Sequence, residues 1–519
     1  MTTFTKLSEH ETPTISFHPS RRLSKINPNI YAGFAEHMGR CIYGGIYDPG
    51  NPLSDENGFR KDVLEALKDL DIPVVRYPGG NFMATYHWID GVGPKDQRPA
   101  RPELAWLGTE TNHFGTDEFL KWCELLGTEP YFCLNFGTGT LDEALGWVEY
   151  CNGRGDTYYA NLRRKNGREE PYNVRPEVPL FMIQTDHLGQ ILGLGNETWG
   201  PWQVEQMTKE ATPTKHSTLK LFDPSLVLVL CGQDGTASWD YYTLKHCLLP
   251  AHSPLSTSAV PLIDMHSIHL YTSSPVHLPN VTAPLAAERA IEITSSLIDL
   301  ARVENGVPAD QTRPTICFDE WNVWDPIRAE GSKGAEESYT LSDALAVAVY
   351  LNVFVRKSKD VGMACIAQSV NVISPLMTTK DGITKQTTWW PLMLFSRFMR
   401  GWTVGAHVAC GVYDGETSPQ WVRGVKDMPW LDVSATLGED GYTNAAVINI
   451  HDSKDIESKI EGVSGQTSVF TVTAGDVMAT NMKGKQEVGV TESVWDGKGT
   501  YLFPRHSLTL LRWRSDEAV

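Results

Sequence analysis

The sequence lacks the features that mark several large classes of protein. No apolar run approaches the roughly 18–20 residues that cross a lipid bilayer, and the start, MTTFTKLSEHETPTISF, has no basic segment followed by an apolar core. No Lys/Arg-rich run stands out among 45 basic and 63 acidic residues, which give a net charge of -18. So acidic a chain repels phosphate backbones. We therefore expect no nucleic-acid partner, no membrane partner and a cytoplasmic location, with secretion by another route left open.

Cysteine is scarce, and its spacing is not that of a disulfide framework. The nine cysteines are an odd number, contain no CxxC pair and include four within strand-like apolar runs, Cys133, Cys231, Cys317 and Cys365. This distribution favours reduced thiols in a core. The HExxH spacing of a zinc site is also missing. We expect neither a metal nor an organic cofactor.

The chain does contain a regular alternation of apolar runs and amphipathic helical patterns. One such pattern, FRKDVLEALKDL (59–70), places its apolar residues on one stripe. The apolar runs are nearly continuous, as in strands that are covered on both faces. There are eight of them: 31–37, 74–79, 129–137, 190–197, 225–232, 263–271, 315–322 and 361–371. Eight β–α units predict an α/β protein with a (β/α)₈ TIM barrel, although strand counting alone leaves a doubly wound sheet open.

The pattern changes after Phe395. Segments such as AAVINI, SVFTVT and SLTLLRW alternate apolar and polar residues and are separated by Gly, Asp and Ser. This alternation is typical of an antiparallel β-sandwich. We therefore predict a barrel over 24–395 and a C-terminal sandwich over 396–519, joined by an N-terminal strand within 1–23.

Polar residues cluster where the predicted strands end, and in a TIM barrel the active site lies at the carboxyl ends of the strands. They are Glu36, His37, Arg76, Asn81, Asn135, Asn196, Glu197, His269, Tyr271, Asp319 and Glu320, with Gln386 in the loop after the last strand. Hydrolysis of a glycosidic bond needs one protonated carboxyl to donate to the leaving oxygen and one ionised carboxylate to attack the sugar. Two acids on different strands, ringed by amides, an Arg, a His and a Tyr, therefore indicate a glycosidase.

Each residue also has an ordinary structural explanation. In a chain with 63 acidic residues, a single Glu at a strand end is most often solvated or ion-paired. Arg76 near a carboxylate is more often a structural ion pair, and His269 is more often a hydrogen-bonded histidine than a catalytic one. Gly79-Gly80 fits a simple turn. No single residue therefore indicates a glycosidase; the combination of these residues does.

Several longer segments, taken together, resemble glycoside hydrolase family 51, the α-L-arabinofuranosidases. The matching segments are NPNIYAGFAEHMGRCIYGGIYDP, VVRYPGGNF, GNETWGPWQ, HSIHLYTSS, FDEWNVWDP, IAQSVNVISPLMT and KQTTWWPL, which span residues 27 to 391 in the family's order. The resemblance implies a barrel with a C-terminal β-sandwich and a retaining, exo-acting enzyme. Its substrates would be terminal α-L-arabinofuranosyl groups of arabinan, arabinoxylan or their oligosaccharides. A homo-oligomer is also consistent with the family.

The resemblance also implies roles for individual residues. Glu197 corresponds to the acid/base, and Glu320 to the nucleophile. Asn196 is expected to bind the sugar 2-hydroxyl, and Arg76 and Tyr271 to hold Glu320 ionised and aimed. The remaining matched residues are Glu36, Asn81 and Gln386, which grip the furanose hydroxyls, His269 beside the acid/base, and Trp199, Trp324 and Trp389 as possible walls for the sugar.

Three segments depart from the family pattern: 174–190, 205–221 and 241–264. The first resembles an insertion, the second a helix shortened around Pro213, and the third is hard to align. Two other functions stay open at this point. One is a retaining endo-β-glucanase or xylanase of related fold, and the other is a sugar-binding barrel without catalysis.

Overall fold

The computed structural model describes residues 2–8, 10–172, 191–199, 211–251, 260–324, 335–416, 426–482 and 484–514. Of the three unusual segments, 174–190 lies outside the described residues, and the other two are described in part. The part of 205–221 that is described forms the helix α5, Ala211–Phe222. Pro213 lies within the described part of this helix.

The first half of the fold is a closed parallel barrel. Its strands follow the order β12-β11-β10-β9-β8-β7-β4-β3, and all of these pairings are parallel. The ring closes where Ala32, beside β3, bridges to Cys365 of β12. There the Ala32 amide lies 3.1 Å from the Ala364 carbonyl, and the Ile366 amide lies 3.0 Å from the Ala32 carbonyl. This closure confirms the TIM barrel and excludes the doubly wound sheet.

All eight apolar runs become barrel strands. Their bounds are β3 Gly33–Phe34, β4 Val74–Tyr77, β7 Glu129–Leu134, β8 Ile191–Leu194, β9 Val227–Leu230, β10 Met265–Thr272, β11 Thr315–Val323 and β12 Val361–Ile366. The strands are buried almost throughout because helices cover the outside and side chains fill the inside.

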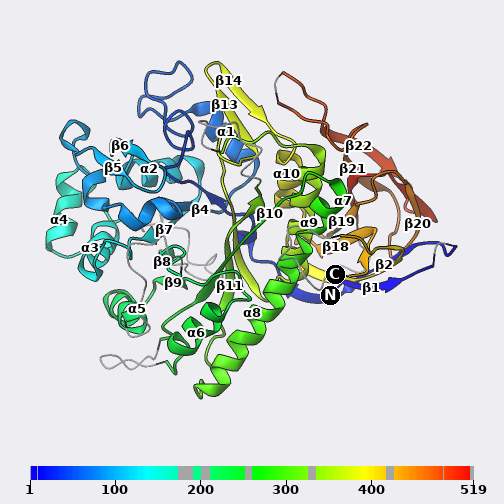
Figure 1. Cartoon of the computed structure of the whole chain (residues 1–519), viewed down its shortest axis with the longest axis horizontal. Helices are drawn as coiled ribbons and strands as arrows, with labels where there is room; N and C mark the ends of the chain where they lie inside the picture. Colours follow the sequence, from blue (N-terminus) through cyan, green and yellow to red (C-terminus); the bar gives the residue numbers. More distant parts are fainter. Residues whose placement is uncertain are drawn as a thin grey trace.

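Helices surround the barrel, as Figure 1 shows. The other helices are α1 Lys61–Asp69, α2 Thr116–Leu126, α3 Leu141–Asn152, α4 Tyr158–Lys165, α6 Ser238–Cys247, α7 His277–Thr282, α8 Leu285–Glu304, α9 Leu341–Arg356 and α10 Trp389–Phe398. Helix α9 is buried along its whole length because it packs both on the barrel and on the second sheet. None of the helices in the described ranges combines the length and apolar character that crossing a membrane requires.

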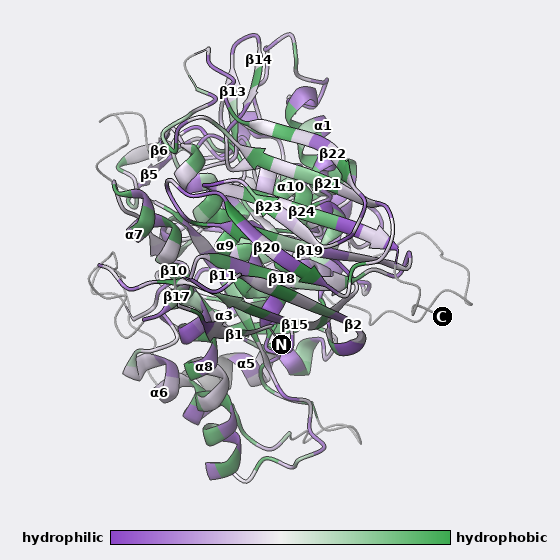
Figure 2. Cartoon of the chain, turned by 90° about the vertical axis from the view of Figure 1, so that its right-hand side faces the viewer, coloured by the Kyte–Doolittle hydropathy of each residue, from purple (hydrophilic) through white to green (hydrophobic). Residues whose placement is uncertain are grey.

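The second half of the fold is a ten-stranded sheet, ordered β22-β21-β24-β19-β18-β15-β2-β20-β23, with β1 also paired to β15. Its strands are β1 Thr2–Lys6, β2 Thr14–Lys25, β15 Trp402–Cys410, β18 Leu431–Leu437, β19 Tyr442–Asn449, β20 Ile456–Glu461, β21 Thr467–Thr473, β22 Gly489–Trp495, β23 Thr500–Phe503 and β24 Ser507–Arg514. Figure 2 views the molecule toward this sheet and shows hydrophobic residues, drawn in green, along β18.

This sheet differs in two respects from a purely antiparallel sandwich. The pairings β1·β15 and β2·β20 are parallel because the N-terminal strands enter the C-terminal sheet. The sheet also curls, so that its two edge strands approach each other, with the rings of Trp495 and Tyr501 centred 5.4 Å apart. A shared apolar core fills the inside of the curl.

A buried arginine joins the two halves and is also paired within the barrel. The guanidinium of Arg356, at the end of α9, lies 2.7 Å from Asp432 of β18 and 2.8 Å from Glu288 of α8. Two-stranded antiparallel pairs lie outside the two large sheets: β5 Arg101–Glu103 with β6 Gly108–Glu110, β13 Leu376–Thr379 with β14 Gly382–Lys385, and β16 Val412–Tyr413 with β17 Met428–Pro429. The described residues also form the 3-10 helices Pro28–Tyr31, Asn81–Thr85, Trp88–Gly91 and Lys95–Gln97.

Candidate active site

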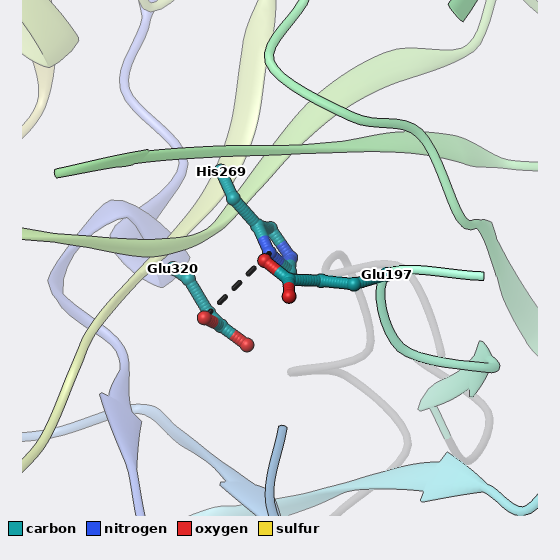
Figure 3. A group of neighbouring side chains, drawn as sticks. All are labelled: Glu197, His269 and Glu320. Atoms are coloured by element: carbon teal, nitrogen blue, oxygen red, sulfur yellow. Dashed lines mark hydrogen bonds and ion pairs between the residues drawn. The ribbon is translucent and has the colours of Figure 1, made fainter. Parts of the chain in front are cut away.

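Three side chains from different strands meet at the carboxyl end of the barrel. Glu320 lies in β11, His269 in β10, and Glu197 follows the end of β8. His269 Nδ1 is 3.2 Å from Glu197 Oε1 and 3.6 Å from Glu320 Oε2. The three groups offer atoms that all lie within 4.8 Å of one another, turned toward the same space (Figure 3). Carboxyl groups about 5–5.5 Å apart suit a retaining glycosidase, whereas about 6.5–9.5 Å suits an inverting one, so the short gap favours retention.

Glu320 is held at both of its oxygens. Arg76 Nη1 donates to Oε1 at 2.6 Å, and the Tyr271 hydroxyl donates to Oε2 at 2.8 Å. Burial disfavours the Arg76 cation, but the neighbouring Cys133, Asp319 and Glu320 outweigh burial and raise the pKa of Arg76 well above its ordinary value. The carboxylate of Glu320 therefore faces a permanent positive charge.

Asp319 contacts both His269, which lies beside Glu197, and Arg76, which binds Glu320. Its Oδ1 lies 3.3 Å from His269 Nε2, and its Oδ2 lies 3.5 Å from Arg76 Nε. Burial alone would raise the pKa of Asp319, but Arg76 and His269 outweigh it and hold that pKa below its usual value. Burial disfavours the His269 cation, but Glu320, Asp319 and Glu197 together raise the pKa of His269 well above normal. The pocket is thus built from alternating charges.

Asn196 and Asn81 lie directly beside these charges. Asn196 Oδ1 accepts from Arg76 Nη2 at 2.7 Å, and Asn196 Nδ2 donates to Asn81 Oδ1 at 3.1 Å. The backbone of Glu197 adopts a positive φ of 46°. This conformation is uncommon for a residue with a side chain, and it occurs at the turn that leaves β8.

Close packing requires glycine at both Gly79 and Gly80, and the positive φ of Gly79 also favours glycine. Gly79 has a φ of 150°, and a Cβ there would lie 2.4 Å from Glu36 Cγ. A Cβ on Gly80 would lie 2.9 Å from Glu320 Oε1. Any larger residue would therefore displace a candidate site carboxyl, so this pair is more than a simple turn.

Glu36 follows β3 and is almost completely enclosed. Its Oε1 accepts from the Phe82 amide at 3.1 Å and from Trp106 Nε1 at 3.2 Å, and its Oε2 accepts from Gln368 Nε2 at 3.0 Å. Burial, reinforced by the nearby Glu320, raises the pKa of Glu36 to about 8. Glu36 is therefore a neutral carboxylic acid at neutral pH, able to donate as well as accept.

The substitution Glu36→Gln is expected to raise the melting temperature, and more so as the pH increases. The unfolded chain loses the Glu36 proton near its ordinary pKa of 4.5, whereas the folded protein keeps it up to about 8. Stability contributed by this group is therefore present below about pH 4.5 and is lost as the pH rises toward about 8. A carboxamide avoids this loss, worth on the order of a few kcal/mol. Calorimetric melting temperatures at about pH 5 and about pH 8 measure the effect.

Glu110 provides a matched control with the opposite sign. It is also buried, but the pKa of Glu110 is lowered because His37, at 2.8 Å, outweighs the effect of burial. Glu110→Gln should therefore lower the melting temperature at about pH 8. If both variants moved the melting temperature in the same direction, the neutral state assigned to Glu36 would be wrong.

Gln386 is a correction to the sequence-based prediction. It is fully buried, and its amide contacts backbone groups: Nε2 donates to the carbonyls of Glu337 at 3.0 Å and Ser374 at 2.8 Å, and Oε1 accepts from the Tyr339 amide at 2.9 Å. These bonds take both of its N–H groups, so Gln386 supports the loop after β12 and does not offer its amide to a sugar. Gln368 is the glutamine that borders the site.

Sequence reasoning missed two residues beside Glu36. Gln368 follows the end of β12, so the same rule that selected the other strand-end residues would have found it. Trp106 lies at the tip of the β5–β6 hairpin and reaches Glu36 only through folding. No local pattern marks that approach.

The three tryptophans suggested as walls occupy different places. Trp324 packs against Tyr271, with ring centres 5.4 Å apart, and Trp199 is half-buried two residues after Glu197. Trp389 is fully buried and lies beneath Lys385, whose Nζ is 4.4 Å from the ring centre. Trp389 is therefore a packing residue and not a wall of the pocket.

Comparison with family models gives two matches. Residues 66–178 match a model described as "Alpha-L-arabinofuranosidase 1 domain", and residues 319–507 match one described as "Alpha-L-arabinofuranosidase C-terminal domain". The second match begins at Asp319, next to Glu320, and continues into the curled sheet.

Whole-chain comparisons agree with these matches. The chain is 82% identical to "Probable alpha-L-arabinofuranosidase C" of Aspergillus terreus, over 99% of this chain and 100% of the relative. It is 34% identical to "Intracellular exo-alpha-(1->5)-L-arabinofuranosidase" of Halalkalibacterium halodurans, over 86% of each. The solved structure of the thermostable GH51 α-L-arabinofuranosidase of Thermotoga petrophila superimposes with a TM-score of 0.84 at 36% identity, covering 97% of this chain and 100% of that one.

Proposed function

The chain belongs to glycoside hydrolase family 51, the α-L-arabinofuranosidases, and from this premise we infer that Glu197 and Glu320 carry its reaction. The protein is an exo-acting α-L-arabinofuranosidase that hydrolyses terminal arabinofuranosyl groups with retention. The observation that supports the assignment is that the two carboxyl groups face each other within 4.8 Å, at the carboxyl end of the barrel.

In the first step Glu320 attacks the anomeric carbon of the arabinofuranosyl group. The bond from that carbon to the leaving oxygen breaks as Glu197 gives its proton to this oxygen, and a covalent arabinosyl ester of Glu320 forms. Positive charge develops on the sugar ring during this step. The Arg76 and Tyr271 contacts at 2.6 and 2.8 Å fix the direction of Glu320 before attack, so little reorganisation is needed.

In the second step Glu197, now ionised, takes a proton from water. The water oxygen forms a bond to the anomeric carbon, the ester bond breaks, and Glu320 leaves as a carboxylate. Two inversions restore the original anomeric configuration, and Glu197 regains its proton. His269, 3.2 Å from Glu197 Oε1, holds that carboxyl toward the sugar in both steps.

We assign sugar binding to the polar groups around the two glutamates. Asn196 and Asn81 are placed to contact hydroxyls on the side of Arg76, and Glu36 is placed to contact hydroxyls near Gln368. A neutral Glu36 both donates and accepts, which matches a sugar hydroxyl. These groups would fix the furanose ring while Glu320 attacks.

The polymer from which the sugar comes is a further proposal. We propose arabinan, arabinoxylan and their short oligosaccharides as sources of the terminal arabinofuranosyl group. We also propose that the enzyme acts inside the cell, where the nine free, buried cysteines would remain thiols. The relative from Halalkalibacterium halodurans, named as intracellular, supports this location.

A panel of chromogenic glycosides tests the function. We expect hydrolysis of 4-nitrophenyl α-L-arabinofuranoside and none of the β-D-xylopyranoside or β-D-glucopyranoside. Proton NMR of the early product should show α-arabinofuranose, because retention preserves the anomer. Arabino-oligosaccharides should release arabinose one unit at a time. A rapid fall in the viscosity of xylan or β-glucan, without release of arabinose, would instead establish the endo-acting alternative.

A further inference from the structure

We propose that Glu197, His269 and Glu320 also form a binding site for a transition-metal dication such as Zn²⁺, which blocks the catalytic pocket. These side chains are also the catalytic groups of the proposed function. The expected inhibition rests on that function, whereas the binding of the metal does not. The site offers two carboxylate oxygens and one imidazole nitrogen, and both kinds of atom are zinc ligands in proteins.

The distances suit a tetrahedral ion. Ligand atoms about 2.0–2.2 Å from a tetrahedral zinc are separated from one another by roughly 3.3–3.6 Å. His269 Nδ1 lies 3.2 Å from Glu197 Oε1 and 3.6 Å from Glu320 Oε2. The remaining separation, between the two glutamates, is within 4.8 Å. If one carboxyl group rotated so that its oxygen moved by about 1 Å, the three side chains would occupy three corners of a tetrahedron around the ion. Water would take the fourth corner.

The second nitrogen of the imidazole is supported in the way that metal-binding histidines require. His269 Nε2 lies 3.3 Å from Asp319 Oδ1, and Asp319 Oδ2 accepts from the Tyr131 hydroxyl at 2.7 Å. A carboxylate on the far nitrogen of a ligating histidine orients the ring and strengthens it as a donor. Here that carboxylate is buried and already fixed by its own hydrogen bonds.

The charges around the three ligands favour a dication. Glu197, Glu320 and Asp319 are carboxyl groups, and the permanent cation of Arg76 contacts two of them, Asp319 and Glu320. A metal bound by these groups would replace both the proton at His269 Nδ1 and the acid proton of Glu197, and both protons would pass to solvent. Mg²⁺ does not suit the site because it prefers octahedral oxygen ligands and keeps several waters.

The same atoms are needed for catalysis, so metal and sugar should exclude each other. Zn²⁺ added to the hydrolysis of 4-nitrophenyl α-L-arabinofuranoside is expected to raise the apparent KM at least tenfold with kcat unchanged. A chelator should restore the original rate, and arabinose should displace the metal. Mg²⁺ at the same concentration should have no effect. Inhibition by Zn²⁺ that lowers kcat with KM unchanged would overturn the proposal.

Direct titration of the resting protein with Zn²⁺ in a calorimeter tests the ligands separately from turnover. His269→Gln and Glu197→Gln each remove a direct ligand and should weaken binding by more than the roughly 10–100-fold that loss of an outer-shell partner costs. The matched control is His87→Gln, because His87 lies 2.9 Å from Glu143 in another His–Glu pair, which is half-exposed and contains none of the three proposed ligands. His87→Gln should keep the full affinity.

Two outcomes distinguish this proposal from the proposed function. Undiminished Zn²⁺ affinity in both His269→Gln and Glu197→Gln, with wild-type melting temperatures showing that the variants are folded, would refute the metal site alone. Failure of the metal-free wild-type protein to hydrolyse the arabinofuranoside would refute the function, while the calorimetric result would still decide on the metal site.

Discussion

Glu320→Ala is expected to lower kcat for 4-nitrophenyl α-L-arabinofuranoside by at least ~10³-fold, since no other group is placed to attack the anomeric carbon. Sodium azide should restore part of the rate by occupying the space that the carboxylate leaves. Azide would then attack in place of Glu320 in a single displacement. The product should therefore be the β-arabinofuranosyl azide, with inverted configuration.

Glu197→Ala should give the opposite stereochemistry. The activated nitrophenyl group leaves without a proton, so Glu320 still forms its ester. Azide then replaces water in the second step, and the expected product is the α-arabinofuranosyl azide, with retained configuration. The configuration of the azide thus assigns the two roles independently of the loss in rate. Chromatography and NMR of the products provide the measurement.

A buried glutamate outside the site is the control for both variants. Glu118 is ion-paired to Arg98 at 2.9 Å, and Glu118→Ala should keep the wild-type kcat without any azide product. Wild-type activity in Glu320→Ala or in Glu197→Ala would contradict the assignments, and so would the same azide anomer from both.

Arg76→Lys is expected to lower kcat by about 10²-fold, the scale associated with misplacing a catalytic group by about 1 Å. The Arg76 guanidinium contacts Glu320 at 2.6 Å, Asn196 at 2.7 Å and Asp319 at 3.5 Å. A lysine keeps the positive charge but has one compact ammonium, which cannot reach all three groups in the same directions. Steady-state kinetics should show the loss mainly in kcat, because the attack by Glu320 depends on its direction.

Arg356→Lys is the matched control. Arg356 is also a buried arginine between two carboxylates, Asp432 and Glu288, but it lies at the junction of the barrel and the curled sheet. Its replacement should destabilise the fold by roughly 1–3 kcal/mol and leave kcat unchanged. An equal fall of kcat in both variants would indicate that Arg76 acts through stability and not through Glu320.

The residue pattern alone predicted the eight barrel strands and most of the site, whereas the bridge between Ala32 and Cys365 was needed to exclude a doubly wound sheet. A strand covered on both faces must be apolar nearly throughout, so eight such runs marked the eight barrel strands, from β3 Gly33–Phe34 to β12 Val361–Ile366. Parallel strands of a barrel end at one rim, so polar residues at their carboxyl ends were bound to lie close together. Arg76, His269 and Glu320 were found by this local rule.

Which glutamine borders the site, and how its acids are charged, follows from contacts that exist solely in the folded protein. Gln386 and Gln368 both follow the last barrel strand, but the backbone partners that occupy the Gln386 amide come from chain segments that meet only on folding. Burial of Glu36, which keeps it protonated to about pH 8, likewise depends on Trp106 and Gln368, brought in from distant parts of the chain. Desolvation and hydrogen-bond saturation are properties of the assembled surroundings, and a linear pattern does not contain them.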